Sequence, residues 1–117
     1  MENKRTIGSE KERLAREYLE KQGYQILECN FYSSYGEIDI IAKDGRWLVF
    51  LEVKYRKSLS AGYPAEAVNR QKRQKLYQTA QYYLYKNRLP ESTPCRFDVV
   101  AILGDKLEHI KDGFGGL

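Results

Sequence analysis

The chain has 117 residues, of which 42% are hydrophobic, 13% aromatic and 31% charged. This composition is typical of a folded, well-solvated domain and excludes a disordered chain; at this length a single domain buries about two thirds of its unfolded surface without disulfides. Twenty Lys and Arg residues against 16 Asp and Glu residues give a net charge of +4, which favours an anionic partner such as nucleic acid.

The cysteine and histidine content argues against two kinds of site. Cys29 and Cys95 stand far apart without CxxC or Cys/His spacing, and His109 is the only histidine. A zinc site and a Cys-His nucleophile are therefore poorly supported. The first residues form no apolar signal core, and no apolar run is long enough to span a membrane. We expect a cytoplasmic protein with free thiols and no membrane partner.

A first helix is predicted from Ser9 to about Gly23. The segment Ser9-Glu10-Lys11-Glu12 matches a capping box, and apolar residues follow it at helical spacing. Helix capping alone explains Glu12 in this interpretation. If the helix begins before Ser9, the capping explanation disappears and Glu12 becomes available for another role.

Three strands are predicted next, at residues 24–31, 37–43 and 47–55. A loop-like segment follows at residues 57–64, and we expect it to be mobile beside the site described below, where it can close over a substrate. These three strands form the first part of a sheet.

The register of the hairpin made by the second and third strands follows from its turn. The segment Lys43-Asp44-Gly45-Arg46 is typical of a type I′ turn, which pairs its first residue with its last. Counting outward, this register pairs Asp39 with Phe50. Glu37 is then opposite Glu52, and Asp39 lies diagonal to Glu52 at roughly 7–8 Å between backbones. The side chains expected on one face of the hairpin are Glu37, Asp39, Phe50, Glu52 and Lys54.

The acids on this face point to a divalent cation. Like charges crowded on one face destabilise a sheet, and Lys54 supplies only part of the compensating charge. Carboxylates without nearby His or Cys ligands favour a hard ion such as Mg²⁺. The alternative without a functional role is a solvated Glu52–Lys54 ion pair at a strand edge, of the kind common on protein surfaces.

The second half of the chain predicts a long helix and two strands. The helix covers residues 65–88 and is ended by Pro90, and the strands cover 96–103 and 107–110. The helix connects the third strand to a strand beside it, which predicts an α/β sandwich with a mixed sheet. The expected apolar stripe of the helix is Val68, Lys72, Leu76, Ala80 and Leu84.

A basic cluster opens the long helix. It consists of Arg70, Lys72, Arg73 and Lys75, and Arg56 extends the end of the third strand. These side chains can contact phosphates, in a sequence-independent interaction that weakens with salt. The alternative is a solvated helix face.

Aromatic and amide side chains offer further contacts to a nucleic acid. The tyrosines of the long helix allow base stacking, but packing in the core and at its rim is the favoured interpretation, because aromatic residues at helical spacing are usually buried. Asn30 is assigned either to substrate contact or to a turn cap. The tyrosines concerned are Tyr77, Tyr82, Tyr83 and Tyr85.

Three motifs resemble those of the bacterial YraN family, a branch of the restriction-endonuclease-like PD-(D/E)xK superfamily that includes Holliday-junction-resolvase-like proteins. The likeness covers almost the whole chain. It implies a single nuclease-like domain over residues 1–117, with helices flanking a mixed sheet in the order α-β-β-β-α-β-β. The motifs are Gly36-Glu37-Ile38-Asp39, Glu52-Val53-Lys54-Tyr55-Arg56 and Cys95-Arg96-Phe97-Asp98-Val99-Val100.

The resemblance also implies roles for individual residues. In this superfamily an aspartate and a glutamate bind a divalent metal, and a lysine helps to activate water; these positions match Asp39, Glu52 and Lys54. Mg²⁺ or Mn²⁺ is the implied metal, with Glu12 as a further metal ligand. Ile38 stands where the motif has proline, so Asp39 is identified by register and resemblance together.

The resulting hypothesis is a Mg²⁺-dependent endonuclease that acts on DNA, with branched DNA among the candidate substrates and a homodimer among the candidate assemblies. The superfamily also contains members that only bind, so a non-catalytic nucleic-acid-binding module is the first alternative. The second is an interaction scaffold in which the hairpin acids form only structural salt bridges.

Overall fold

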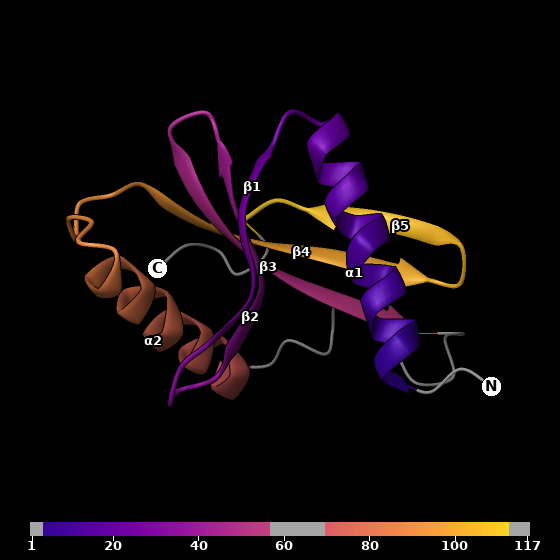
Figure 1. Cartoon of the computed structure of the whole chain (residues 1–117), viewed down its shortest axis with the longest axis horizontal. Coiled ribbons are helices and arrows are strands. Elements are labelled where there is room, and N and C mark those ends of the chain that lie inside the picture. The colour runs from indigo at the N-terminus through magenta and orange to yellow at the C-terminus, as the bar shows by residue number, and fades with distance from the viewer. Residues whose placement is uncertain (1–3, 57–69, 113–117) are drawn as a thin grey trace.

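Seven helices and strands make up the described part of the chain (Figure 1). The computed structural model describes residues 4–56 and 70–112. The predicted α/β class and the order α-β-β-β-α-β-β are confirmed. No helix in these two ranges is long and apolar enough to cross a bilayer. The elements are α1 (Lys4–Lys21), β1 (Gln25–Tyr32), β2 (Glu37–Asp44), β3 (Trp47–Arg56), α2 (Arg70–Lys86), β4 (Cys95–Leu103) and β5 (Lys106–Ile110).

The five strands form one mixed sheet in the order β1-β2-β3-β4-β5. β3 and β4 are parallel, whereas the other neighbouring pairs are antiparallel. Two parallel neighbours need a crossover connection, and α2 lies in it, as the sequence predicts. The predicted mobile loop at 57–64 and the first predicted turn of the helix, at 65–69, lie outside the described residues.

The two helices cover opposite faces of this sheet (Figure 1). Because successive residues of a strand point to opposite faces, β3 contributes to two separate cores. Phe50 packs in the core under α2, while its neighbours Val49 and Leu51 pack in the core under α1. Of the predicted stripe on α2, Leu76 and Ala80 are buried and Leu84 is partly buried.

The first helix differs from its prediction at one end and agrees at the other. It begins at Lys4, so Ser9 lies inside the helix and the predicted capping box is wrong. A Ser-x-x-Glu pattern is compatible with a helix interior as well as a start, and the preceding residues continue the helix. The end near Gly23 is confirmed: Gly23 has φ +94°, and the N–H groups of Gly23 and Tyr24 donate to the carbonyls of Glu20 and Leu19, the pattern of a Schellman cap.

The hairpin register is also corrected. Ile41 lies opposite Phe50 and Ile40 opposite Leu51, so the predicted pairings of Asp39 with Phe50 and of Glu37 with Glu52 are wrong. The reason is the turn: Asp44 pairs with Trp47, and of the two loop residues only Gly45 has a positive φ, +59°. Glycine at the first loop position with a positive φ indicates a type II′ turn, not type I′.

The corrected register keeps the acids on the same face of the sheet. The observed pairing differs from the predicted pairing by two positions. Because side chains alternate between the two faces of a strand, a shift by two positions leaves each side chain on its predicted face. Beyond the last printed pair, Ile40 with Leu51, the backbone N–H of Val53 donates to Oδ2 of Asp39, so Asp39 lies beside the part of β3 that carries Glu52. The two acids therefore remain neighbours on the hairpin.

Candidate metal and nucleic-acid site

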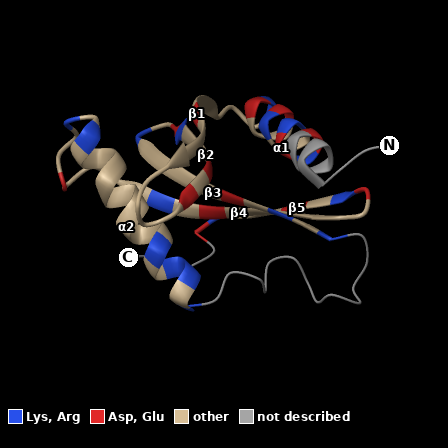
Figure 2. Cartoon of the chain, turned by 60° about the horizontal axis from the view of Figure 1, so that its bottom comes forward, with Lys and Arg blue, Asp and Glu red and all other residues tan. Residues whose placement is uncertain are grey.

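A hollow of about 370 Å³ lies between the β2–β3 hairpin and α2. Figure 2 shows acidic segments on the central strands and basic segments on α2 beside them. The strands supply acids to the hollow and the helix supplies lysines, so oppositely charged walls face one another. Its lining residues are Gly36, Glu37, Asp39, Glu52, Gln71, Lys72, Lys75 and Leu76.

Asp39 is a carboxyl group in a poorly solvated position. Its Oδ2 accepts a hydrogen bond of 2.8 Å from the backbone N–H of Val53, the next residue after Glu52. Burial, followed by the negative charge of Glu52, raises the pKa of Asp39 to about 7. A bound cation opposes both effects, because it favours the charged form of a carboxyl group.

Glu52 is the centre of the ion pairs in this site. Its side chain is buried, with 6% of the residue exposed. The Nζ atoms of Lys54 and Lys72 lie 2.9 Å and 3.0 Å from the same oxygen, Oε1. Lys72, which the sequence assigned to nucleic-acid contact, therefore reaches into the acidic site itself.

The two lysines differ in how firmly they hold their protons. Burial, together with the contact with Lys72, lowers the pKa of Lys54 despite the opposing charge of Glu52. For Lys72 burial acts in the same direction, but the contacts with Lys54 and Glu52 outweigh it and raise the pKa. Of the pair, Lys54 is the side chain that releases a proton more readily.

Two further acids contribute to the electrostatics of the hollow. Burial raises the pKa of Glu37, a hydrogen bond from Tyr32 opposes this shift, and the charges of Glu12 and Glu52 add to it. Glu12, on α1, also raises the pKa of Asp39. The four acids therefore form one interacting group, although Glu12 comes from the helix on the other face.

Because α1 begins at Lys4, Glu12 does not cap this helix. Its Oε2 accepts a hydrogen bond of 3.3 Å from Asn30 Nδ2. Asn30, within β1, has a left-handed backbone, with φ +54°. The structure thus brings together Glu12, predicted as a metal ligand, and Asn30, predicted as a substrate contact or turn cap.

The remaining predicted basic residues differ in whether they reach the acidic hollow. Lys75 is exposed and lines the acidic hollow. Arg70 and Arg73 line a neighbouring hollow of about 420 Å³ near the start of α2. The Arg56 side chain donates a hydrogen bond of 2.9 Å to the carbonyl oxygen of Tyr55. Besides Lys54 on β3, the basic side chains that line the acidic hollow are therefore on α2.

The carboxylates of the site are compatible with Mg²⁺ or Mn²⁺ if water and substrate supply the remaining ligands. Among the described residues, no three His, Cys, Asp or Glu side chains are grouped closely enough to hold a metal by themselves. Mg²⁺, however, commonly uses one or two carboxylates and takes its other ligands from water and substrate phosphate. Asp39 and Glu52 are the two carboxylates that fit such a site, with Glu12 at its edge.

Comparison with known proteins places this chain in a family. The profile of the uncharacterised protein family UPF0102 matches residues 11–102. A UPF0102 protein of Lachnoclostridium phytofermentans is 52% identical over 112 residues, which cover 96% of this chain and 95% of the relative. A UPF0102 protein of Thermodesulfovibrio yellowstonii is 50% identical over 108 residues, 92% of this chain and 95% of the relative.

The chain belongs to the UPF0102 family. A third UPF0102 protein, of Persephonella marina, is 44% identical and matches 92% of this chain and 91% of its own length. The family name states no activity, so the chemistry of the UPF0102 chain has to be argued from its residues.

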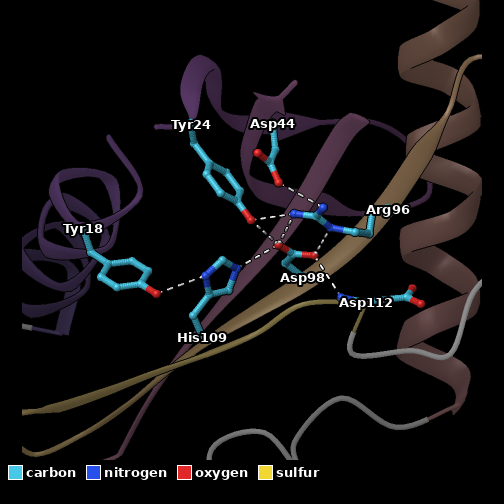
Figure 3. A network of polar contacts seen from close by, with 7 residues as sticks. All are labelled: Tyr18, Tyr24, Asp44, Arg96, Asp98, His109 and Asp112. Atoms are coloured by element: carbon cyan, nitrogen blue, oxygen red, sulfur yellow. Dashed lines mark hydrogen bonds and ion pairs between the residues drawn. The ribbon is translucent and has the colours of Figure 1, made fainter. Parts of the chain in front are cut away.

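The UPF0102 chain contains a second polar cluster that sequence reasoning missed, centred on Asp98 (Figure 3). Asp98 is fully buried, and Arg96 donates to both of its oxygens at 2.9 Å and 3.0 Å. His109 Nε2 lies 2.8 Å from Oδ2, Tyr24 donates to Oδ2, and the N–H of Asp112 donates to Oδ1. One carboxylate of β4 therefore contacts β5, through His109, and the residue that precedes β1, Tyr24.

The charge state of Asp98 follows from this cluster. Burial opposes ionisation, but hydrogen bonds from His109, Arg96 and the Asp112 N–H outweigh it and lower the pKa of Asp98 to about 2. The signal in the sequence was the alternation Arg96-Phe97-Asp98, which puts an acid and a base on one face of an otherwise apolar strand.

The tyrosines of α2 divide into two groups. Tyr83 is buried and Tyr77 packs against the core under α2, which confirms the predicted packing role for these two. Tyr82 is 38% exposed and its ring centre lies 6.0 Å from that of Phe31, as expected for rim packing. Tyr85 is 81% exposed, so the packing prediction is wrong for Tyr85. Helical spacing predicts which residues share a face but not how far the sheet extends beneath the helix.

Proposed function

We propose that this protein is a Mg²⁺- or Mn²⁺-dependent endonuclease that hydrolyses phosphodiester bonds in DNA, with branched DNA as one candidate substrate. The observation that carries the proposal is that Asp39 and Glu52 line one hollow beside the basic helix α2, and that Lys54 pairs with Glu52 at 2.9 Å. The resemblance of these three residues to the metal-binding and water-activating residues of the PD-(D/E)xK superfamily supports it.

The chemistry assigns separate roles to the acids and the lysines. Asp39 and Glu52 would hold the metal ion, with Glu12 supporting it from α1. When bound, such an ion activates water and stabilises charge on the phosphate. Lys54, whose pKa is lowered, is the group suited to take a proton from the attacking water at its Nζ atom. Lys72 keeps its proton and is suited to pair with a phosphate oxygen.

The charge of α2 supports DNA as the partner. Over its 17 residues the helix carries five basic and no acidic side chains, which is more positive charge than the net +4 of the whole chain. Contacts from such a surface to phosphates are independent of sequence and weaken steeply with salt. Arg73, Lys75 and Lys72 are the predicted phosphate contacts on this helix, and Arg56 and Asn30 are predicted contacts outside it.

One observation favours a second candidate, a nucleic-acid-binding module without catalysis. Both Lys54 and Lys72 occupy Oε1 of Glu52, so an internal pair of cations already compensates this carboxylate. In a binding-only protein the acids would serve to position the lysines. A homodimer and a cytoplasmic location stay predictions under either candidate.

A cleavage assay separates these functions. Linear, nicked, flapped and four-way DNA are incubated with Mg²⁺ or Mn²⁺ and the wild-type protein, Asp39→Asn, Glu52→Gln or Lys54→Ala. Matched controls replace exposed residues of the same type away from the hollow, namely Asp105→Asn, Glu20→Gln and Lys106→Ala. We expect the site variants to lose cleavage by 100-fold or more, on the order of the effects of acid–base and metal-site groups, and the controls to cleave like wild type.

Three results would decide against the endonuclease. Folded site variants that cleave as well as wild type would show that Asp39, Glu52 and Lys54 are not the catalytic residues. A wild-type protein that binds DNA but does not cut, and that binds no metal in calorimetry, would establish the binding module. A protein that neither cuts nor binds nucleic acid would leave the interaction scaffold.

A further inference from the structure

A second hollow, which we call the tyrosine groove, lies on α2 and has no role in the mechanism above. Its volume is about 440 Å³, and its walls carry three tyrosine rings and two glutamine amides. The exposed fractions are 48% for Tyr35, 38% for Tyr82 and 81% for Tyr85. Large aromatic side chains gathered at a surface hollow often mark a binding site. The lining residues are Tyr35, Gln78, Gln81, Tyr82 and Tyr85.

The tyrosine groove adjoins the acidic hollow through a shared wall. The chain turns between β1 and β2 at Ser33 to Gly36, and this turn is tied to α2 by a contact of 3.2 Å between Ser33 Oγ and Thr79 Oγ1. Gly36 lines the acidic hollow, and its neighbour Tyr35 lines the tyrosine groove. Consecutive residues of one turn therefore line the two hollows, which places the hollows next to one another along α2.

A single face of α2 runs through both hollows. Five of the helix residues that line them follow one another at intervals of four, three, four and three positions, the spacing of one helical face. The first and last of these five are 14 positions apart, which corresponds to about 21 Å of helix. The residues in order are Gln71, Lys75, Gln78, Tyr82 and Tyr85.

The rings in the tyrosine groove differ in how firmly they are held. Tyr82 lies with its ring centre 6.0 Å from that of Phe31, a buried core residue, so its orientation is fixed by packing. Tyr85, one helical turn further, projects into solvent. A fixed ring beside a projecting ring is suited to holding flat groups by stacking.

The positive charge of α2 around the tyrosine groove favours an anionic partner. The face lies on a helix with five basic and no acidic residues, and Lys75 on the same stripe is exposed. A second copy of the chain docking here would bring two positively charged helices together, which costs energy. A flexible polyanion with flat apolar groups satisfies both the charge and the rings.

We propose that the tyrosine groove stacks the unpaired bases of a nucleic acid strand whose backbone runs along α2 to the acidic hollow. The partner class is thus DNA with a single-stranded segment, and the glutamines offer hydrogen bonds to base edges. Stacking on aromatic side chains is typical of proteins that bind single strands without sequence preference. The inference rests on the proposed function for the nature of the partner, but not for cleavage.

Binding measured without cleavage tests this inference. A fluorescein-labelled single-stranded oligodeoxynucleotide and a blunt duplex of the same sequence are titrated by anisotropy in EDTA, with wild type, Tyr85→Ala, Tyr85→Phe and Tyr35→Ala. Leu27→Ala is the matched control, since Leu27 is an exposed apolar residue, 41% accessible, on β1. A second oligonucleotide with 2-aminopurine reports stacking of the base directly.

The expected results separate stacking from charge. The two Ala variants should bind the single strand about 5- to 100-fold more weakly than wild type, whereas Tyr85→Phe and Leu27→Ala should match wild type. The salt dependence should stay unchanged in Tyr85→Ala, because no ionic contact is lost, but should become shallower in Lys75→Ala. Wild type should prefer the single strand to the duplex and should quench 2-aminopurine.

Other results would overturn the inference without touching the proposed function. They are equal affinity of the Ala variants and wild type for the single strand, equal losses for single strand and duplex, or a change from dimer to monomer in Tyr85→Ala by analytical ultracentrifugation. Conversely, a protein that shows the expected stacking but never cleaves would retain this inference and lose the endonuclease.

Discussion

The ammonium group of Lys72, on α2, lies 3.0 Å from Oε1 of Glu52, a buried carboxylate on β3. This contact crosses from the helix layer to the sheet and uses the same oxygen as Lys54. A divalent cation that binds Glu52 has to share this carboxylate with two ammonium groups. The strength of metal binding therefore depends on Lys72 as well as on the acids.

Removing Lys72 should tighten metal binding. In Lys72→Ala one positive charge leaves the immediate surroundings of Glu52, and an opposing unit charge at about 4 Å contributes about 1 kcal/mol or more even at the dielectric constant of water. We expect the affinity for Mn²⁺ in isothermal calorimetry to rise at least about fivefold. Lys75→Ala is the matched control, because Lys75 lines the same hollow and is exposed. Unchanged or weaker binding in Lys72→Ala would show that the lysine does not compete with the metal.

Removing the charge of Asp39 should abolish stabilisation by metal. An ion that binds only the folded state raises the free energy of unfolding, by about 2.7 kcal/mol when its free concentration is 100 times the dissociation constant. We expect this increase in wild type and its loss in Asp39→Asn, which keeps an oxygen to accept the Val53 N–H. Urea unfolding with and without Mn²⁺ measures the difference, and Asp105→Asn serves as control. Equal stabilisation of both proteins would exclude Asp39 as a ligand.

Sequence periodicity was sufficient to predict the fold and the face that carries the acids, because a register error of two positions leaves each side chain on the same face of the sheet. The displaced hairpin shows this: Asp39 and Glu52 stayed on one face although their pairing was wrong. The contact between Lys72 and Glu52 and the cluster around Asp98 join residues that are distant in sequence. Such contacts depend on how helices are placed on the sheet, which local patterns do not encode.

The role of Glu12 can be tested by separating stability from metal binding. If Glu12 capped α1, its replacement would cost about 1 kcal/mol of stability. Because Glu12 lies inside the helix and is only partly buried, we expect Glu12→Gln to change the free energy of unfolding by less than about 0.5 kcal/mol. Its effect should appear instead as weaker Mn²⁺ binding. Glu20→Gln, at an exposed position of the same helix, controls for the loss of a charge. A large loss of stability with unchanged metal affinity would mark Glu12 as structural.

The Asp98 cluster predicts a different kind of defect, one of stability alone. Asp98→Asn leaves Arg96 without its buried negative partner, and breaking a buried ion pair costs about 3–5 kcal/mol. We expect a loss of this size in urea unfolding at neutral pH, while Asp105→Asn should unfold like wild type. A loss below about 1 kcal/mol would show that the cluster contributes little to the fold.

The pH dependence of this loss follows from the pKa of Asp98. The folded-state pKa of about 2 lies below the ordinary value of 3.8, so the charged form stabilises the fold above about pH 4, and this contribution disappears as the pH falls from about 4 to 2. Each pKa unit corresponds to about 1.4 kcal/mol. The gap in unfolding free energy between wild type and Asp98→Asn should therefore narrow by about 2 kcal/mol over this range, as measured by urea unfolding at a series of acidic pH values. If the difference in unfolding free energy stays constant from pH 7 to pH 2, folding does not change the pKa of Asp98. Its partners would then stabilise the protonated and the charged form equally well.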